Sequence, residues 1–483
     1  MKKVILNFKK TVSIISIMLL VGVGCVNLDE TPLDFTSPDN FYGTVGQIEA
    51  SLTGAMGALY SQWGNYSYGW GPFHDDHIYG RDLVFSASHG TWCWEAHYGA
   101  VAILNSVIAA LNEDKLGPTV PQADKDVLMA QAKFLRGFNY FWLVRLYGDV
   151  PIITEDTDVV AGEIVRDPIA NVYDLIIADL QVAEANLPDA WEEGKGGRPS
   201  KWAAKTLLAK VYITMATAPM NNTAYYQNAR DKAKDVIDNG PYDLVADVRE
   251  VFALENKFSP EIMFSFNATE DDIATPPQIW LPGSMAFGWG DFALEKDWAE
   301  AYPEQPRKDA YMILYDWDST SYLDWDGTHT PHLRKYVYNS REVMESLNTW
   351  ANIPLIRFAD ALLLFAEAEN QVNGGPTQAA VDAVNRVIDR ANDYVDNPSH
   401  PKLTTSMSQA EFDAAVIDER GLELFFEYDR WFDLVRKRIL CEKVRDAMKV
   451  NCDENDYLWP IPYTDLLLNP NLTQNPGYTS PSD

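Results

Sequence analysis

Amphipathic segments follow one another in pairs along this chain, and this pairing constrains the fold more than any other feature of the sequence. In each segment apolar residues recur at three- and four-residue intervals, as in a helix with one buried face. The paired segments are 126–146 with 170–187, 202–215 with 225–237, and 355–372 with 377–391. Further helices are expected from residue 45, at 101–111 and at 409–434. Because stacked antiparallel helix pairs form TPR-like arrays, we predict a mostly α fold. It is an α-α superhelix of TPR-like helix pairs with few short strands.

Two regions interrupt the helical pattern, one at residues 62–94 and the other at 266–350. Both are rich in Gly, Pro, Asp, Trp and Tyr, and neither shows sustained periodicity. Long loops on a packed scaffold usually carry the function of a protein. We therefore predict a single domain at 45–483, with these two aromatic-rich loop insertions as its functional surface.

The N-terminal segment has the pattern of a bacterial lipoprotein leader. Four lysines precede an apolar run, which ends in small residues directly before Cys25. That run is too short to span about 30 Å of hydrocarbon as a helix. We expect residues 1–24 to be a lipoprotein signal peptide, Cys25 to carry the lipid, and 25–44 to form an extended tether to a membrane. Gly22 stands where the usual motif has Leu, so an ordinary secretory signal stays open. Both alternatives export the protein.

Net charge and cysteine content limit the partners of the chain. The formal charge of −31 excludes nucleic acid and anionic lipid headgroups, because phosphate binding needs clustered Lys and Arg. The cysteines after Cys25 have no spacing typical of a metal site. Cys441 and Cys452 could form a disulfide in an oxidising compartment, which would leave Cys93 free.

Five groups of short motifs follow one another in order along the chain. They are QAKFLR (131–136) with LYGDVP (146–151), GRPSKWAA (197–204), IRFAD (356–360) with AEA (366–368), ERGLEL (419–424) with FE (426–427), and PIP (460–462) with QNPGY (474–478). Together they resemble the SusD/RagB family, the surface glycan- or peptide-capturing lipoproteins of Bacteroidota. The resemblance implies a lipid-anchored protein on the outer-membrane surface, which captures a ligand and delivers it to a SusC-like TonB-dependent transporter.

We expect most of these motif residues to belong to the scaffold. Four arginines lie on predicted helices among apolar residues, where a buried guanidinium must be paired. They are Arg136, Arg357, Arg420 and Arg430. The expected partners are Glu367, Glu423, Glu427 and Asp433.

The resemblance does not place the ligand, because ligand sites in this family lie in variable loops. We therefore choose candidates by chemistry. Aromatic rings pack against the apolar faces of sugars, and carboxylate or guanidinium groups form paired hydrogen bonds with hydroxyls. The candidate ligand-binding residues are Tyr66, Trp70, Asp75, Arg81, Asp82 and Trp92 in the first loop, and Trp289 and Trp317 in the second. Trp94 is expected in the core, because it shares helical spacing with Tyr98.

No residue pattern indicates catalysis or a resident cofactor. The sequence contains no HExxH, no GxSxG and no phosphate-binding glycine loop. We predict no metal at 74–77, since adjacent residues rarely converge on one ion. Calcium stays open at 316–318 and 324–327, where acidic oxygens lie in turn-like contexts. Our primary hypothesis is a non-catalytic glycan-binding receptor. The alternatives are a peptide-binding receptor with the same delivery role and an extracytoplasmic glycoside hydrolase.

Overall fold

A computed structural model describes most of the chain after the predicted tether. The described residues are 41–64, 75–79, 90–158, 163–192, 194–269, 280–285, 288–290, 292–325, 329–337, 341, 345, 350, 352–395, 398–447 and 451–481. The predicted signal peptide and the lipidation site at Cys25 therefore lie outside the described residues.

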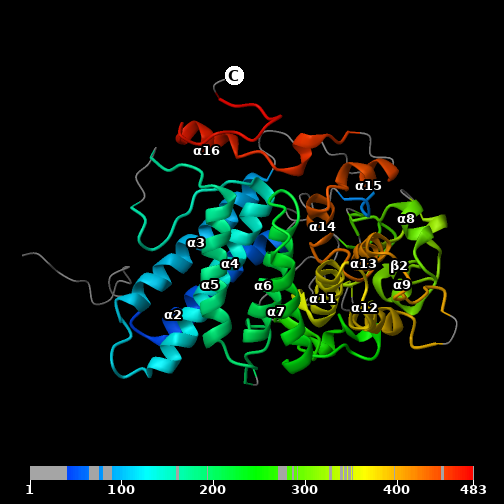
Figure 1. Cartoon of the computed structure of the whole chain (residues 1–483), viewed down its shortest axis with the longest axis horizontal. Coiled ribbons are helices and arrows are strands. Elements are labelled where there is room, and N and C mark those ends of the chain that lie inside the picture. The colour runs from blue at the N-terminus through cyan, green and yellow to red at the C-terminus, as the bar shows by residue number, and fades with distance from the viewer. Residues whose placement is uncertain are drawn as a thin grey trace, which may run out of the picture.

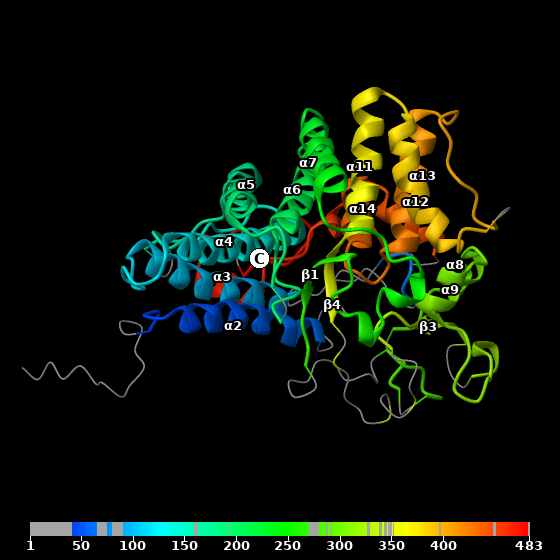
Figure 2. The ribbon, with the colours of Figure 1, turned by 90° about the horizontal axis from the view of Figure 1, so that it is seen from below.

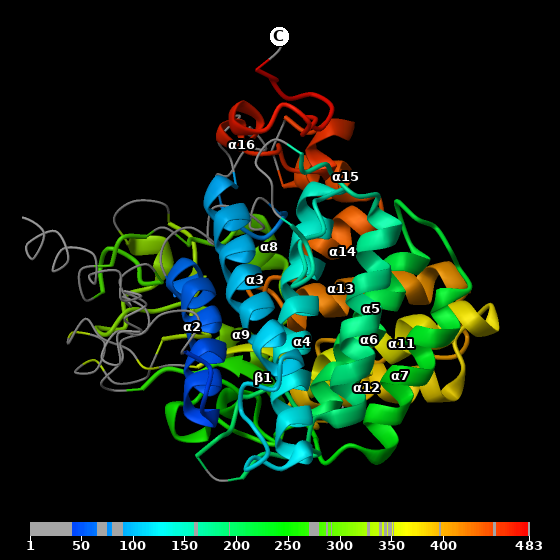
Figure 3. The ribbon, with the colours of Figure 1, turned by 90° about the vertical axis from the view of Figure 1, so that its left-hand side faces the viewer.

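The scaffold is an array of antiparallel helices (Figures 1 and 3). Its helices are α2 (Val45–Gly64), α3 (Thr91–Asn112), α4 (Gln122–Tyr147), α5 (Ile169–Asn186), α6 (Lys201–Ala216), α7 (Tyr225–Asn239), α11 (Phe358–Asn373), α12 (Gln378–Ala391) and α13 (Gln409–Glu423). As predicted, α4 packs against α5, α6 against α7, and α11 against α12. In Figure 2 the axes of α6, α7 and α11 turn away from those of α2 to α4, as in a superhelix. The predicted mostly α class is confirmed.

Contact between α7 and α11 joins the two halves of the array, although a long segment separates them in the sequence. That segment contains most of the strands. β1 (Ile262–Phe266) pairs antiparallel with β4 (Ile353–Arg357), and β2 (Met312–Ile313) pairs antiparallel with β3 (His332–Leu333). The helix predicted from residue 355 therefore begins only at Phe358, after β4 ends.

Short helices complete the described part of the chain. They are η2 (Val248–Glu250), η3 (Leu254–Asn256), α8 (Lys296–Ala301), α9 (Pro306–Tyr311), η5 (Tyr322–Asp324), α14 (Arg430–Arg436), α15 (Leu440–Asp446), η6 (Glu454–Tyr457) and α16 (Tyr463–Leu468). The second predicted loop thus contains α8, α9, β2 and β3. These elements are too short to show a helical or strand period in the sequence.

Local sequence explains where several helices begin and end. Ser200 starts α6 by accepting a hydrogen bond from the backbone N–H of Ala203 at 3.2 Å. A reciprocal capping box between Ser408 and Glu411 starts α13. Gly374 ends α11 in the left-handed conformation, with φ 69°, which an L side chain rarely adopts. The start of α6, the start of α13 and the end of α11 therefore follow from the capping residues in the local sequence.

The prediction of one helix at 409–434 is wrong, because the chain breaks between α13 and α14. Phe426 and Tyr428 lie in this break with φ of 62° and 73°. The break brings the carboxylate of Glu427 to within 2.6 Å of Lys335 Nζ and 2.6 Å of Arg357 Nε. Both cations are buried and need a counter-charge, so tertiary pairing overrides the local helical pattern.

Buried ion pairs join the helices, as predicted for the motif arginines. Arg357 contacts Glu423 at 3.1 Å and Glu427 at 2.6 Å. Arg420 Nε lies 2.7 Å from Asp433 Oδ2. These pairings are confirmed, and each one joins residues that the sequence marked as buried charges.

The two remaining motif arginines have partners that the sequence did not indicate. Arg136 Nε lies 2.7 Å from Asp179 Oδ2, and Arg430 Nη2 lies 2.6 Å from Asp76 Oδ2. Glu367, an expected partner, instead contacts the cations at the end of α14. The expected partner set was therefore wrong for Arg136 and Arg430, because partners far apart in the sequence leave no local signal.

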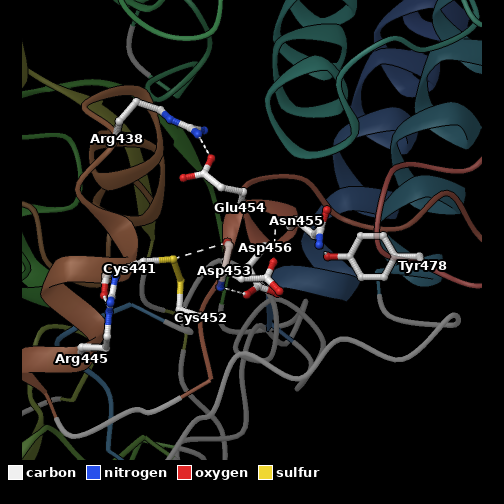
Figure 4. The surroundings of a disulfide bond; sticks show 9 residues. All are labelled: Arg438, Cys441, Arg445, Cys452, Asp453, Glu454, Asn455, Asp456 and Tyr478. Atoms are coloured by element: carbon white, nitrogen blue, oxygen red, sulfur yellow. Dashed lines mark hydrogen bonds and ion pairs between the residues drawn. A yellow bond between two sulfur atoms is a disulfide. The ribbon is translucent and has the colours of Figure 1, made fainter.

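A disulfide joins Cys441 of α15 to Cys452, with the two Cα atoms 5.2 Å apart. The pairing that the sequence left open is thus confirmed, and Cys93 is buried outside this disulfide. The bond holds the segment that carries η6 beside α15 (Figure 4). Arg438 and Glu454 form an ion pair next to it.

Candidate functional site

The two predicted loops meet in space. The backbone N–H of Tyr79 donates to the carbonyl of Ala293 at 3.0 Å, and that of Glu295 donates to the carbonyl of His77 at 2.8 Å. Ala293 also forms an antiparallel bridge with His332. We call the surface built on these segments the loop face; it comprises residues 75–79, 288–290, 292–295, 315–325 and 329–333. It gathers aromatic residues from both insertions.

A buried ion pair fixes the loop face to the scaffold. Asp76 accepts hydrogen bonds from Arg430 Nε at 2.8 Å and Nη2 at 2.6 Å, and both side chains are buried. Burial acts to raise the Asp76 pKa, but the charges of Arg430 and His77 outweigh it and hold this pKa well below its usual value. The ring of His77 stacks on Trp298 of α8, with centroids 4.0 Å apart. The first loop is therefore attached to both α14 and α8.

The same residues form the one metal-like cluster found among the described residues. Potential ligand atoms of Asp75, Asp76 and His77 lie within 4.8 Å of one another. However, both oxygens of Asp76 are bound to Arg430. This donor set fits an ion pair better than a cation, because a metal would have to displace the guanidinium.

Several predicted site residues lie outside the described residues. They are Tyr66, Trp70, Arg81 and Asp82. Of the other first-loop candidates, Asp75 is buried, and its carboxylate accepts the backbone N–H of His77 at 2.8 Å. Trp92 is half-buried in the first turn of α3, with its ring 6.3 Å from that of Trp459. A ligand-binding role for these residues stays a prediction.

The second-loop candidates differ in exposure. Trp289 is 53% exposed. Trp317 is half-buried, and its indole N–H has no hydrogen-bond partner among the described residues. It packs beside a small cluster of Leu281, Met285, Ile313 and Trp325. The structure thus brings Asp75, Trp289 and Trp317 to the loop face. Trp94 is buried in the core, as predicted, with its ring 5.0 Å from that of Tyr147.

Two tyrosines of the loop face are exposed: Tyr79 was not among the candidates, whereas Tyr315 is one of the aromatic residues that the second predicted loop offers to a ligand. Tyr79 is 46% exposed and Tyr315 is 61% exposed. Asp316 Oδ1 accepts the backbone N–H groups of Asp318 at 3.0 Å and Thr320 at 2.8 Å, which closes a turn directly after Tyr315. This turn follows the exposed ring of Tyr315 directly in the sequence. One Asp316 oxygen is therefore already used by the turn. Calcium binding at 316–318 stays a prediction.

A helical scaffold that presents exposed aromatic rings on fixed loops is an architecture suited to ligand binding. Comparisons with known proteins agree with it. The SusD family model matches residues 245–478, and a model described as "Starch-binding associating with outer membrane" matches residues 43–213. SusD-like protein P2 of Formosa agariphila is 28% identical, over 96% of this chain and 98% of its own.

Solved structures show the same fold. A SusD homolog from Bacteroides thetaiotaomicron has a TM-score of 0.81 at 22% identity, over 91% of this chain and 98% of that one. A laminarin binding SusD-like protein has a TM-score of 0.73 at 22% identity, over 90% of this chain and 100% of that one. The chain belongs to the SusD-like family, as its motifs indicated. Members of this family are non-catalytic carbohydrate-binding proteins, which confirms the prediction that the chain is not an enzyme.

Proposed function

We propose that this protein is a non-catalytic receptor that binds a glycan on its loop face. The observation that carries the proposal is the exposure of Trp289, Tyr315 and Tyr79 on segments joined by backbone hydrogen bonds. Flat rings of this kind pack against the apolar C–H faces of sugars. Because the Asp76–Arg430 pair holds the surface in place, little order has to be gained on binding. The starch-binding description of the matched family model and the laminarin-binding neighbour support a glycan ligand.

Isothermal titration against a glycan panel tests this proposal. The first ligands are starch and laminarin oligosaccharides. Trp289→Ala and Tyr315→Ala should each weaken binding about fivefold, since one aromatic platform contributes about 1 kcal/mol. Tyr394→Ala is the matched control, because Tyr394 is 58% exposed but lies after α12, outside the loop face. Its affinity should equal that of the wild type.

Three results would contradict the proposal. Unchanged affinity in a Trp289→Ala, Tyr315→Ala double variant would exclude the loop face as the binding surface. Release of reducing ends from the panel would favour a glycoside hydrolase. Binding of peptides but of no glycan would favour a peptide receptor with the same delivery role.

We further infer that the receptor is lipid-anchored at Cys25 on the outer-membrane surface and delivers its ligand to a SusC-like TonB-dependent transporter. The leader pattern and the outer-membrane description of the matched model support this location. Among the described residues, no helix is both long and apolar enough to cross a membrane. The wild type should incorporate labelled palmitate and co-purify with a TonB-dependent barrel in mild detergent. Palmitate labelling that persists in Cys25→Ala, or purification without any barrel, would contradict the corresponding part of this inference.

A further inference from the structure

A concave site lies away from the loop face. It is found where the C-terminal segment crosses the ends of the helices, an arrangement that Figure 1 shows for the backbone. We call it the C-terminal pocket. It has a volume of about 380 Å³ and lies between the end of α4, the start of α5, the end of α6, α14 and residues 454–476. No residue of the loop face lines it. Its volume is within the range of small-molecule sites.

Arg145 is the unusual side chain of this pocket. Its guanidinium carbon lies 3.8 Å from the ring centroid of Phe141 and 3.6 Å from that of Phe432, so the group is held between two aromatic faces. Its Nε donates to the carbonyl of Phe141 at 3.0 Å. With the residues that the structure describes, Arg145 forms no ion pair, and its two terminal nitrogens donate no hydrogen bond. The motif arginines discussed above all contact carboxylates.

The surroundings of Arg145 disfavour an isolated charge. Burial lowers the Arg145 pKa to about 10, although the carboxylate of Asp429 acts in the opposite direction. Asp429 is itself bound to Lys210, with Oδ2 2.7 Å from Nζ. A cavity of about 20 Å³ on that side of Arg145 is too small for an organic ligand. Arg145 also lines the larger C-terminal pocket, which has room for an anionic group.

Arg166, another residue that lines this pocket, adds a second positive charge that no ion pair neutralises within the described residues. Its guanidinium donates to neutral acceptors, among them the carbonyls of Tyr147 at 2.9 Å and Thr473 at 2.8 Å and the side-chain oxygen of Asn475 at 2.7 Å. These bonds fix the C-terminal segment and leave the charge of Arg166 in place. In a protein with a net charge of −31, such a positive pocket is a local exception.

The remaining lining suits a sugar. Tyr173, Tyr457 and Leu458 provide apolar surface, whereas the Gln474 amide is engaged by backbone groups of the C-terminal segment. The pocket also contains two acidic side chains. Glu454 is paired with Arg438 at the exposed rim, as Figure 4 shows, and the Asp149 carboxylate accepts the backbone N–H that begins α5. Both carboxylates are therefore already engaged, and neither is bound to Arg145.

We propose that the C-terminal pocket binds the carboxylate of an acidic sugar unit, a uronate, with Arg145 as its direct partner. A guanidinium forms two parallel hydrogen bonds with a carboxylate, and the aromatic faces above and below Arg145 fix the plane of the fork. The apolar lining packs against the sugar ring. This inference rests on the proposed function, because it assigns an acidic component to the glycan that the receptor binds.

Isothermal titration with monosaccharides separates this pocket from the loop face. D-Glucuronate and D-galacturonate are the probes, D-glucose is the neutral control, and acetate tests the carboxylate alone. Glucuronate should bind at least about tenfold more tightly than glucose or acetate, since hydrogen bonds between charged groups exceed neutral ones by this order. Arg145→Gln should weaken glucuronate binding about tenfold, whereas Trp289→Ala should leave it unchanged.

Equal binding of glucuronate and glucose, or unchanged glucuronate binding in Arg145→Gln, would overturn the inference. Acetate binding as tight as that of glucuronate would overturn its sugar part. Crystals of the wild type soaked in glucuronate give a readout that needs no variant: density beside Arg145 supports the pocket, and density only elsewhere overturns it. Loss of neutral-glycan binding in Trp289→Ala together with no glucuronate binding would refute this inference and leave the proposed function intact. Glucuronate binding at Arg145 without any glycan binding at the loop face would support the C-terminal pocket and refute the loop face as the binding surface.

Discussion

Removing the charge of Asp76 should loosen the loop face from the helical scaffold. Asp76 accepts two short hydrogen bonds from Arg430, across 354 residues of sequence, and both side chains are buried. Asp76→Asn leaves the guanidinium without its counter-charge, and breaking a buried pair in this way costs about 3–5 kcal/mol. We therefore expect the free energy of unfolding to fall by about 3 kcal/mol or more. Glycan affinity should fall with it, because residues 75–79 are attached to the scaffold through this pair.

Urea unfolding at pH 7 and glycan titration measure both effects. Asp174→Asn is the control: it makes the same change at an exposed carboxylate of α5, outside the loop face, so its cost should stay below about 0.5 kcal/mol. Despite burial, Arg430 lowers the Asp76 pKa. The stabilisation is therefore complete above the unfolded-state pKa of about 4 and is lost as pH falls toward the lower folded-state value. Equal unfolding free energies for the wild type and Asp76→Asn at pH 7 would refute the reasoning.

Further predictions concern the scaffold. Reducing the Cys441–Cys452 disulfide should lower the free energy of unfolding by about 2–3 kcal/mol, because the cross-link restricts the unfolded chain; urea unfolding with and without dithiothreitol measures this loss. Burial lowers the His97 pKa to about 4 in the folded protein, whereas the unfolded chain has the ordinary value of about 6.5. Between these two pH values the unfolded chain binds a proton that the folded protein does not. The free energy of unfolding should therefore fall as the pH drops from 6.5 to 4. An NMR titration that gives His97 a pKa near 6.5 in the folded protein would contradict this prediction. Gly197→Ala should cost about 2 kcal/mol in thermal unfolding, because φ is 77° and the added Cβ would collide with the Asn267 side chain. A melting temperature equal to that of the wild type would count against it.

The helical scaffold could be predicted from the sequence because its information is local. A buried helix face repeats every three to four residues, and caps such as Ser408 and Gly374 mark the ends. The break between α13 and α14 could not be predicted in this way. The apolar pattern continues through it, and only the buried cations Lys335 and Arg357, far away in the sequence, draw Glu427 out of the helix.

The candidate site was predictable to the level of the loops but not of the side chains. Composition identified both insertions, yet exposure within them depends on which turn each residue occupies. Trp317 packs beside a small apolar cluster, whereas Tyr315, two residues earlier, is exposed because Asp316 closes the turn behind it. No sequence pattern indicated a ligand-binding role for Arg145 either. Among the apolar residues of α4 it looks like any other buried arginine, and only the structure reveals that no described carboxylate pairs with it.

Long-range pairing of charges connects these observations. Buried ion pairs add little net stability, because the cost of desolvation offsets much of their attraction. A buried charge that needs one particular partner nevertheless favours one arrangement of the chain. Asp76 with Arg430 holds the first loop to α14, and the bonds from Arg166 to Asn475 and the neighbouring carbonyls hold the C-terminal segment to the end of α4. Each set lies beneath one of the two surfaces to which we assign ligands. The side chains that we propose as direct ligand contacts, Trp289, Tyr315 and Arg145, are thus distinct from the charged groups that hold their segments in position.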